Sequence, residues 1–337
     1  MNVIAIPKNK IEEFLQKITE SSWRLVAPVK NEEILDWKEI DSAAQVCIDD
    51  GITLKSLKEF FFPQAEMFLK FTESEEPVET IVYRDTVIFG ARPCDLYALK
   101  VLTEVFSKGA FSDPFFVEHK KKTLIIGLGC INEKPGCFCK DRGIEKGFSA
   151  DCDVFLNDAG DYYTAEVLTE AGQSLIDRFL PGCRKIDADK APVHTGKESG
   201  AALELCADEK ELFEKIDWEK ISETCLGCGT CTFVCGTCHC FAFQDVTEKG
   251  ETKRYRCWDS CMYPKFTLHA SGHNPRPSKK ERYRQRLLHK FLYIKENYGL
   301  VACSGCGRCN RSCPVGINIR SAVKKIMEEI TFRGEST

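Results

Sequence analysis

The sequence repeats one cysteine pattern twice, as CLGCGTCTFVC at residues 225–235 and as CSGCGRCNRSCP at residues 303–314. In each copy three cysteines follow at three-residue intervals, and a fourth comes four residues later. This C-x2-C-x2-C-x3-C spacing is typical of bacterial ferredoxins, whose cysteine thiolates hold iron-sulfur clusters. Glycines between the cysteines, such as Gly227 and Gly305, permit the tight backbone curl that brings three thiolates to one cluster. The repeat therefore predicts a site for two [4Fe-4S] clusters.

In two-cluster ferredoxins the fourth cysteine of each run binds the cluster of the other run. We expect cluster one to be bound by Cys225, Cys228, Cys231 and Cys313. We expect cluster two to be bound by Cys303, Cys306, Cys309 and Cys235. Structural zinc is the alternative, but zinc sites use pairs of ligands, and two runs of four cysteines exceed that need. The first run is followed by Gly236 where the second has Pro314, which changes the local turn but not the number of ligands.

Composition and charge agree with a metal-binding role for the cysteines. The chain has 337 residues, 20 cysteines and a net charge of −4. We find neither a secretory leader nor an apolar run of about 20 residues, so we expect a cytoplasmic protein without a membrane span. Cytosolic thiols are kept reduced, so metal ligation is favoured over disulfides. The acidic balance argues against a general nucleic-acid binder.

The fold expected is α+β, with three segments. Residues 1–180 form a mixed α/β domain, residues 181–209 a connector, and residues 210–337 a mostly helical ferredoxin-like domain with the two clusters. Apolar runs at 86–90 and 123–127 predict buried strands with a helix between them, hence a β-α-β unit. Neither Gly127-Leu128-Gly129 nor Gly227-Cys228-Gly229 completes a dinucleotide-binding fingerprint, so we expect no flavin or nicotinamide in this chain.

A third set of cysteines lies in the first domain. Cys94 and Cys130 each follow one of the two predicted strands, and Cys137 and Cys139 come shortly afterwards. Adjacent parallel strands bring their carboxyl ends to one edge of a sheet, where ligand sites of α/β proteins form. These four thiols predict a third iron-sulfur cluster, with a structural zinc or a redox disulfide as the alternatives.

Eight further cysteines have no place in these three sets. Cys238, Cys240 and Cys261 either hold another metal, replace ligands of the first cluster, or pack as buried thiols against it. The sequence does not decide between these roles. A packing role is expected for Cys47, Cys152, Cys183, Cys206 and Cys257.

The segment 276–286 carries six Lys or Arg residues against one Glu. We interpret it as a helix whose guanidinium groups neutralise anionic clusters or contact a partner subunit, with nucleic-acid binding as the alternative. We expect His239, His269 and His273 to be surface or capping residues rather than ligands.

The chain resembles the iron-sulfur beta subunit of cytoplasmic sulfhydrogenases (hydrogenase/sulfur reductase), which is akin to the iron-sulfur subunit of anaerobic sulfite reductase. The resemblance covers nearly the whole chain. The motifs that carry it are APVK at 27–30, FFFP at 60–63, IFGARPCD at 88–95, the Cys130 and Cys137-Phe138-Cys139 element, Cys238-x-Cys240, WDSC at 258–261, GHNPRP at 272–277 and CSGCGRC at 303–309.

The resemblance implies an electron-transfer subunit without a catalytic residue of its own, serving an oxidoreductase complex of anaerobic metabolism. It would relay electrons between a flavoprotein subunit that binds FAD and oxidises NAD(P)H and a terminal catalytic subunit. The terminal subunit would be a nickel-iron hydrogenase, a sirohaem sulfite reductase or another flavin-based enzyme. Two other functions stay open: reduction of a sulfur substrate or disulfide at a cluster with an unligated iron, motivated by the surplus cysteines, and an iron-sulfur sensor that binds nucleic acid.

Overall fold

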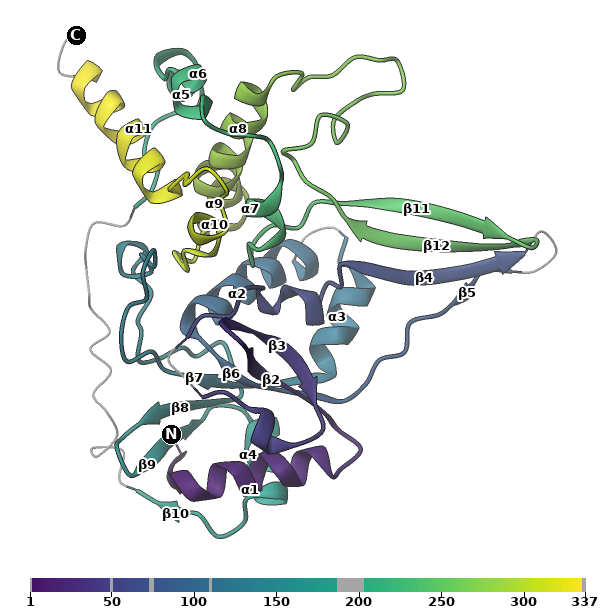
Figure 1. Cartoon of the computed structure of the whole chain (residues 1–337), viewed down its shortest axis with the longest axis vertical. Coiled ribbons are helices and arrows are strands. Elements are labelled where there is room, and N and C mark those ends of the chain that lie inside the picture. Colours follow the sequence, from purple (N-terminus) through teal and green to yellow (C-terminus); the bar gives the residue numbers. More distant parts are fainter. Residues whose placement is uncertain (1, 49–50, 73–75, 109–110, 187–202, 335–337) are drawn as a thin grey trace. The chain divides into compact units, whose positions relative to one another are not determined.

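The computed structural model describes residues 2–48, 51–72, 76–108, 111–186 and 203–334. The chain divides into two compact units, each built from separated segments of the sequence (Figure 1). Unit 1 comprises Met1–Phe61, Tyr83–Ala201 and Ser304–Cys306. Unit 2 comprises Phe62–Val82, Ala202–Cys303 and Gly307–Thr337.

Unit 1 contains an eight-stranded mixed sheet in the order β10-β1-β9-β8-β7-β6-β2-β3. Its strands are β1 (Asn2–Pro7), β2 (Arg24–Asn31), β3 (Ile34–Ile40), β6 (Thr86–Ala91), β7 (Thr123–Leu128), β8 (Val154–Asp158), β9 (Tyr162–Val167) and β10 (Arg184–Lys185). The four neighbours β2, β6, β7 and β8 run parallel, and the outer pairings are antiparallel. Every residue of β6 is buried, as expected for a strand covered on both faces.

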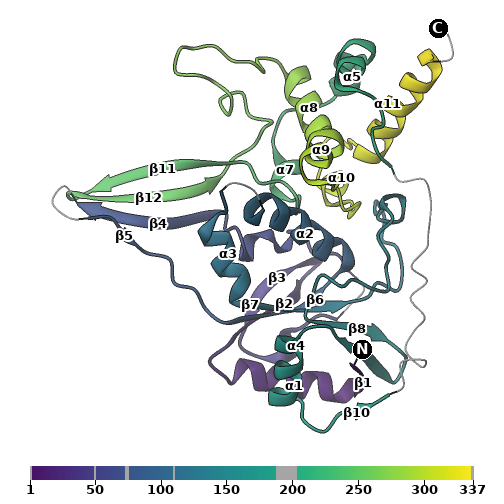
Figure 2. The same cartoon turned by 180° about the vertical axis from the view of Figure 1, so that it is seen from behind.

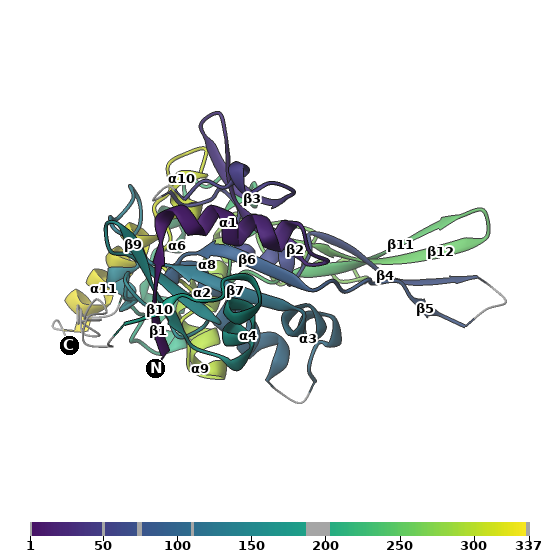
Figure 3. The ribbon, with the colours of Figure 1, turned by 90° about the horizontal axis from the view of Figure 1, so that it is seen from below.

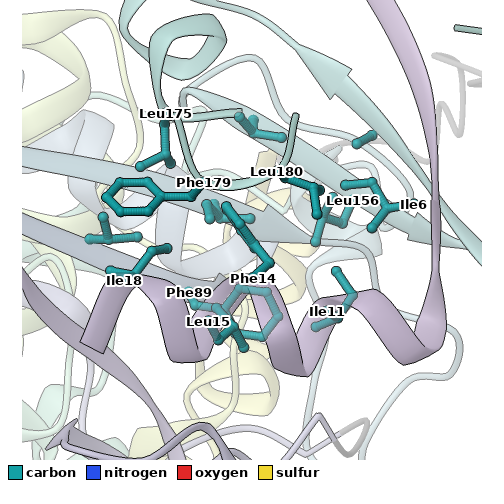
Figure 4. Packing of buried hydrophobic residues seen from close by; sticks show 14 of the residues in the cluster. Ile6, Ile11, Phe14, Leu15, Ile18, Phe89, Leu156, Leu175, Phe179 and Leu180 are labelled. Carbon is teal, nitrogen blue, oxygen red and sulfur yellow. The ribbon is translucent and has the colours of Figure 1, made fainter. Parts of the chain in front are cut away.

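Helices cover both faces of this sheet (Figures 1 and 2). They are α1 (Lys8–Thr19), α2 (Pro93–Ser107), α3 (Pro114–Lys121) and α4 (Glu170–Phe179), with short 3-10 turns η1 (Ala43–Gln45), η2 (Leu57–Phe60) and η3 (Lys140–Arg142). Helices α1 and α4 lie on one face, and α2 and α3 on the other. The α1 face buries Phe14 and Ile18 against Phe179 of α4 and Phe89 of β6 (Figure 4).

The predicted β-α-β unit is present, because β6, α2 and β7 follow one another and the two strands pair in parallel. This arrangement confirms the mixed α/β class of the N-terminal region. Its consequence for function is that the residues after β6 and after β7 meet at one edge of the sheet.

Unit 2 combines helices with a second sheet. Its helices are α5 (Glu209–Lys215), α6 (Trp218–Ser222), α7 (Thr230–Phe233), α8 (Lys279–Leu288), the π-helical turn η5 (His289–Tyr293), α9 (Ile294–Tyr298), α10 (Arg308–Arg311) and α11 (Ile319–Gly334). Its antiparallel sheet has the order β11-β12-β4-β5, from β4 (Ala65–Thr72), β5 (Val78–Glu79), β11 (Phe241–Glu248) and β12 (Glu251–Trp258). These strands form the long ribbon in Figure 3.

A mostly helical C-terminal domain is therefore not confirmed, since a strand hairpin occupies 241–258. Segment 62–82, which the predicted bounds assign to the first domain, belongs to unit 2. The physical reason is long-range pairing: β4 runs along β12, and Glu66 accepts a 2.8 Å hydrogen bond from Arg256 with both side chains buried. Of the predicted connector, residues 187–202 lie outside the described residues.

Candidate iron-sulfur sites

Five cysteines of the two runs line one cavity in unit 2. Cys225, Cys228, Cys231 and Cys313 are the four assigned to cluster one, and Cys309 is assigned to cluster two. Cys225 and Cys228 stand on the curled loop that leads into α7, Cys231 lies within α7, and Cys313 follows α10. The structure thus brings together the four residues that the sequence assigns to cluster one.

The loop can curl because its glycines adopt a backbone conformation that other residues avoid. Gly227 and Gly229 have φ angles of 71° and 78°. A Cβ atom at Gly229 would lie 2.7 Å from the Tyr263 ring, so even a methyl group has no room there. Backbone N–H groups point at the sulfurs: Gly227 donates to Cys225 Sγ at 3.4 Å, and Ile317 donates to Cys313 Sγ at 3.3 Å. Such donors stabilise the negative charge of a bound cluster.

One side of the cavity is open to solvent. Cys228 is exposed, and Leu226 beside it has an exposed fraction of 65%. Hydrogen bonding with Thr230 lowers the pKa of the Cys228 thiol, which favours the thiolate that metal ligation requires. The other walls are mostly apolar, with Met262, Ile317 and Ile319 among them.

The four cysteines assigned to cluster two are divided between the units. Cys235, Cys303 and Cys309 belong to unit 2, whereas Cys306 belongs to unit 1. The thiol of Cys238 donates a hydrogen bond to Cys235 and, with the nearby Lys290 charge, lowers the pKa of Cys235. Cys303 is buried, and its thiol interacts electrostatically with Lys290.

The surplus cysteines of unit 2 lie close to the first run. Cys238 contacts Cys235, and Cys261 is buried in hydrogen-bonding contact with Cys240. Both that contact and burial raise the pKa of Cys261. Cys257 lies within β12 and is half-buried.

The third set of cysteines also converges, at the predicted edge of the unit 1 sheet. Cys94 begins the first turn of α2 after β6, and Cys130 follows β7. Together with Cys137 and Cys139 they line one cavity. Burial raises the pKa of Cys139 to about 11, so this thiol needs a metal to become a thiolate at neutral pH.

Sequence reasoning missed that Cys306 lines the same cavity as this third set. Cys137 Sγ lies 3.4 Å from the Cys306 carbonyl oxygen, and the Phe138 N–H donates to the Gly305 carbonyl at 2.7 Å. The segment 304–306 therefore packs on the loop that carries Cys137 and Cys139. No sequence signal relates two segments so far apart.

The spacing of these thiols bears on which metal group they suit. Within the described residues, no three Cys, His, Asp or Glu side chains converge closely enough to hold a single metal ion. A four-iron cluster is much larger than one ion, and its thiolate ligands stand correspondingly farther apart. Several cysteines line each of the two cavities, and cysteine thiolates are the ligands that [4Fe-4S] clusters use.

The basic segment folds mainly into α8, and its side chains bind within unit 2. Arg282 donates to the carbonyls of Arg276 and Pro277, and Arg284 lies over the Phe213 ring at 3.8 Å. Arg286 is 3% exposed and faces the cysteines. Of the guanidinium groups that we expected beside the clusters, the one that faces the cysteines is that of Arg286.

Lys290, one helical turn beyond Arg286, is a second buried cation that sequence reasoning missed. Its ammonium group donates to Cys235 Sγ at 3.1 Å. The available signal was the four-residue spacing from Arg286 inside an apolar helical pattern, which puts both charges on one face.

Comparison with known proteins agrees with this geometry. Residues 224–317 match a family described as a 4Fe-4S dicluster domain. Over 342 aligned residues, the chain is 28% identical to sulfhydrogenase 2 subunit beta of Pyrococcus furiosus, and the alignment covers 97% of this chain and 99% of the relative. The chain is thus related to a sulfhydrogenase beta subunit along nearly its whole length. No solved structure matches it significantly.

These matches confirm the resemblance that the motifs predicted, and they support an iron-sulfur protein of an oxidoreductase system. The dicluster match implies two [4Fe-4S] clusters for this sulfhydrogenase-beta-like chain. Among the helices of the described residues, none is long and apolar enough to cross a membrane.

Proposed function

We propose that this chain is an iron-sulfur electron-transfer subunit. It relays electrons between a subunit that oxidises NAD(P)H through FAD and a terminal catalytic subunit in a cytoplasmic redox complex of anaerobic metabolism. The observation that carries this proposal is that Cys225, Cys228, Cys231 and Cys313 line one cavity within the segment that matches a 4Fe-4S dicluster domain. The relative's name, a sulfhydrogenase subunit, favours a hydrogenase and sulfur-reductase partner over a sirohaem sulfite reductase or another flavin-based enzyme.

The residues of the chain would hold the clusters and set their surroundings. Cys225, Cys228, Cys231 and Cys313 bind cluster one, and Cys303, Cys306, Cys309 and Cys235 bind cluster two. When bound, such clusters accept and donate single electrons. The exposed Cys228 and Leu226 make cluster one the place where electrons pass to or from a partner, because transfer requires close approach.

A third cluster is proposed at Cys94, Cys130, Cys137 and Cys139. The support is their shared cavity at the carboxyl edge of the parallel strands β6 and β7. This cluster would add a third one-electron site to the chain.

A second function is favoured by the surplus thiols. Cys238 contacts Cys235, and Cys240 contacts Cys261, so more thiols surround the second predicted cluster than it needs. A cluster with an exchangeable iron there would reduce a sulfur substrate or disulfide. This function would be excluded if, in protein purified without oxygen, no iron can be exchanged or removed by a chelator.

The test is anaerobic purification of the complex from the native cell, followed by iron and sulfide analysis and electron paramagnetic resonance. We expect co-purification with a flavoprotein and a catalytic subunit, and about eight irons per chain, or about twelve with the third cluster. Cys306→Ala should lose one cluster and block transfer to the terminal subunit, while the matched control Cys206→Ala, at an exposed cysteine outside every set, should keep both. Zinc without iron or sulfide in the wild type would refute the proposal.

A further inference from the structure

Two buried cations lie among the cysteines of unit 2. Arg286 belongs to α8, and Lys290 belongs to the π-helical turn η5 that continues it. Each side chain is 3% exposed. Because residues four apart lie on the same face of a helix, both charges point to the same side. π-Helical turns occur frequently at functional sites.

The contacts of both cations lead to cysteines. Lys290 donates to Cys235 Sγ at 3.1 Å, to Thr237 Oγ1 at 2.7 Å and to the Ala302 carbonyl at 2.8 Å. Arg286 donates to Cys238 Sγ at 3.4 Å and to the Cys231 carbonyl at 3.0 Å. The three donors of the ammonium group are thereby all used, which fixes its position beside Cys235.

Neither cation forms an ion pair with a carboxylate of the described residues. Another buried cation of unit 2 does have such a partner. Arg256 is 1% exposed and forms an ion pair with Glu66 at 2.8 Å. A buried charge without a counter-charge is strongly unfavourable. The negative charge that balances Lys290 and Arg286 must therefore come from cysteine thiolates and from whatever the thiolates bind.

The nearest groups to both cations are sulfurs: Lys290 donates to Cys235 Sγ and Arg286 to Cys238 Sγ. Each positive charge is therefore held against a thiol group of the first run or of the pair that follows it.

We propose that Lys290 is a positioning residue that raises the reduction potential of the cluster bound through Cys235, whereas Arg286, which also lines the cavity of the cluster-one cysteines, acts on both clusters. The inference rests on the proposed electron-transfer function. Adding an electron makes a cluster more negative, and a fixed positive charge at hydrogen-bond distance from a ligand sulfur stabilises that state more than the oxidised one. Because Lys290 is buried, this effect is weakly screened.

The contacts of Lys290 single out one cluster. Lys290 donates directly to Cys235 and to none of the four ligands assigned to cluster one. Arg286, by contrast, lines the cavity that holds those four ligands. Removing the Lys290 charge should therefore shift the potential of the cluster bound through Cys235 relative to that of cluster one.

The test is a potentiometric titration of the complex, followed by electron paramagnetic resonance, with Lys290→Met, Lys290→Gln and Lys290→Arg. The matched control is Lys295→Met, which removes a lysine from the next helix whose side chain is 39% exposed and paired with Glu204. We expect Lys290→Met and Lys290→Gln to shift one cluster to a more negative potential by at least 59 mV, a tenfold change in its one-electron equilibrium. Lys290→Arg should restore most of the shift, and Lys295→Met should leave both potentials unchanged.

Three other outcomes would overturn the inference. Variants with full iron content and unshifted potentials would show that the charge does not act on the cluster. Loss of iron in both uncharged variants, with Lys290→Arg retaining iron, would show a structural role instead. A wild-type protein that contains no iron-sulfur signal would refute the proposed function itself, so the two failures are distinguishable.

Discussion

Gly305 offers a sharp test of how the loop of the third cysteine set is held in unit 1. Its φ angle is 63°, and its carbonyl accepts the 2.7 Å hydrogen bond from the Phe138 N–H. A Cβ atom there would lie 2.6 Å from the Cys139 backbone nitrogen and 2.7 Å from the Cys139 Cα. Backbone atoms cannot rotate away as a side chain can, so Gly305→Ala must displace the Cys139 loop.

Gly316 supplies the matched control. Its φ angle is 69°, but a Cβ atom there would meet nothing within 4 Å. Gly316→Ala therefore carries only the left-handed strain of an alanine, about 1–2 kcal/mol. Gly305→Ala carries the same strain and also loses the Phe138 hydrogen bond, about 1 kcal/mol, before any steric cost. We expect it to destabilise the protein by at least about 2 kcal/mol.

The assay is anaerobic urea unfolding of both variants, with iron measured on the folded protein. Gly305→Ala should unfold at a lower urea concentration than Gly316→Ala and should lose the iron of the third cluster. Gly316→Ala should keep the wild-type iron content. Equal unfolding midpoints and equal iron in the two variants would refute the packing argument.

Two further predictions concern unit 2. Glu66→Ala should destabilise the protein by about 3–5 kcal/mol, because the buried Arg256 would lose its carboxylate partner. Asp245→Ala, which breaks the exposed pair with Arg254, should destabilise it far less in the same unfolding assay. Burial, together with His239, lowers the pKa of His289 to about 3. In the unfolded chain the pKa of a histidine is about 6.5. Between pH 6.5 and pH 3 the unfolded state therefore binds one more proton than the folded state. The free energy of unfolding must fall as the pH drops below about 6.5. His289→Gln should flatten that fall between pH 6.5 and 5, and parallel curves for the two proteins would contradict the assignment.

Local pattern was sufficient for several features of this protein. The helix at 8–19 follows from apolar residues at helical spacing, and the strands at 86–91 and 123–128 follow from short apolar runs. The convergence of Cys94 with Cys130 follows from one general property of parallel strands. Each of these inferences uses residues close in sequence or a rule about how neighbouring strands pair.

Other features depend on contacts that no local pattern encodes. The hairpin at 241–258 is weakly apolar, and it joins a sheet because β4, nearly two hundred residues earlier, pairs with its second strand. The spacing of Lys290 from Arg286 puts the two on one helix face, but its contact with Cys235, 55 residues earlier, exists only in the folded chain. Cys306 was expected to act within the second run alone, yet it also lines the cavity of the first-domain cysteines.

The cysteine spacing therefore sets the chemistry, because three thiolates at fixed short intervals can reach one cluster from a single curled loop. It also predicts that Cys313 joins the first run, and Cys313 lines the same cavity as Cys225, Cys228 and Cys231. Tertiary structure alone decides which charges surround the thiolates, which sulfurs reach solvent, and which distant segments share a cavity. The reason is that electrostatic environment and burial depend on residues brought together by the whole fold, whereas ligand spacing is a property of eleven consecutive residues.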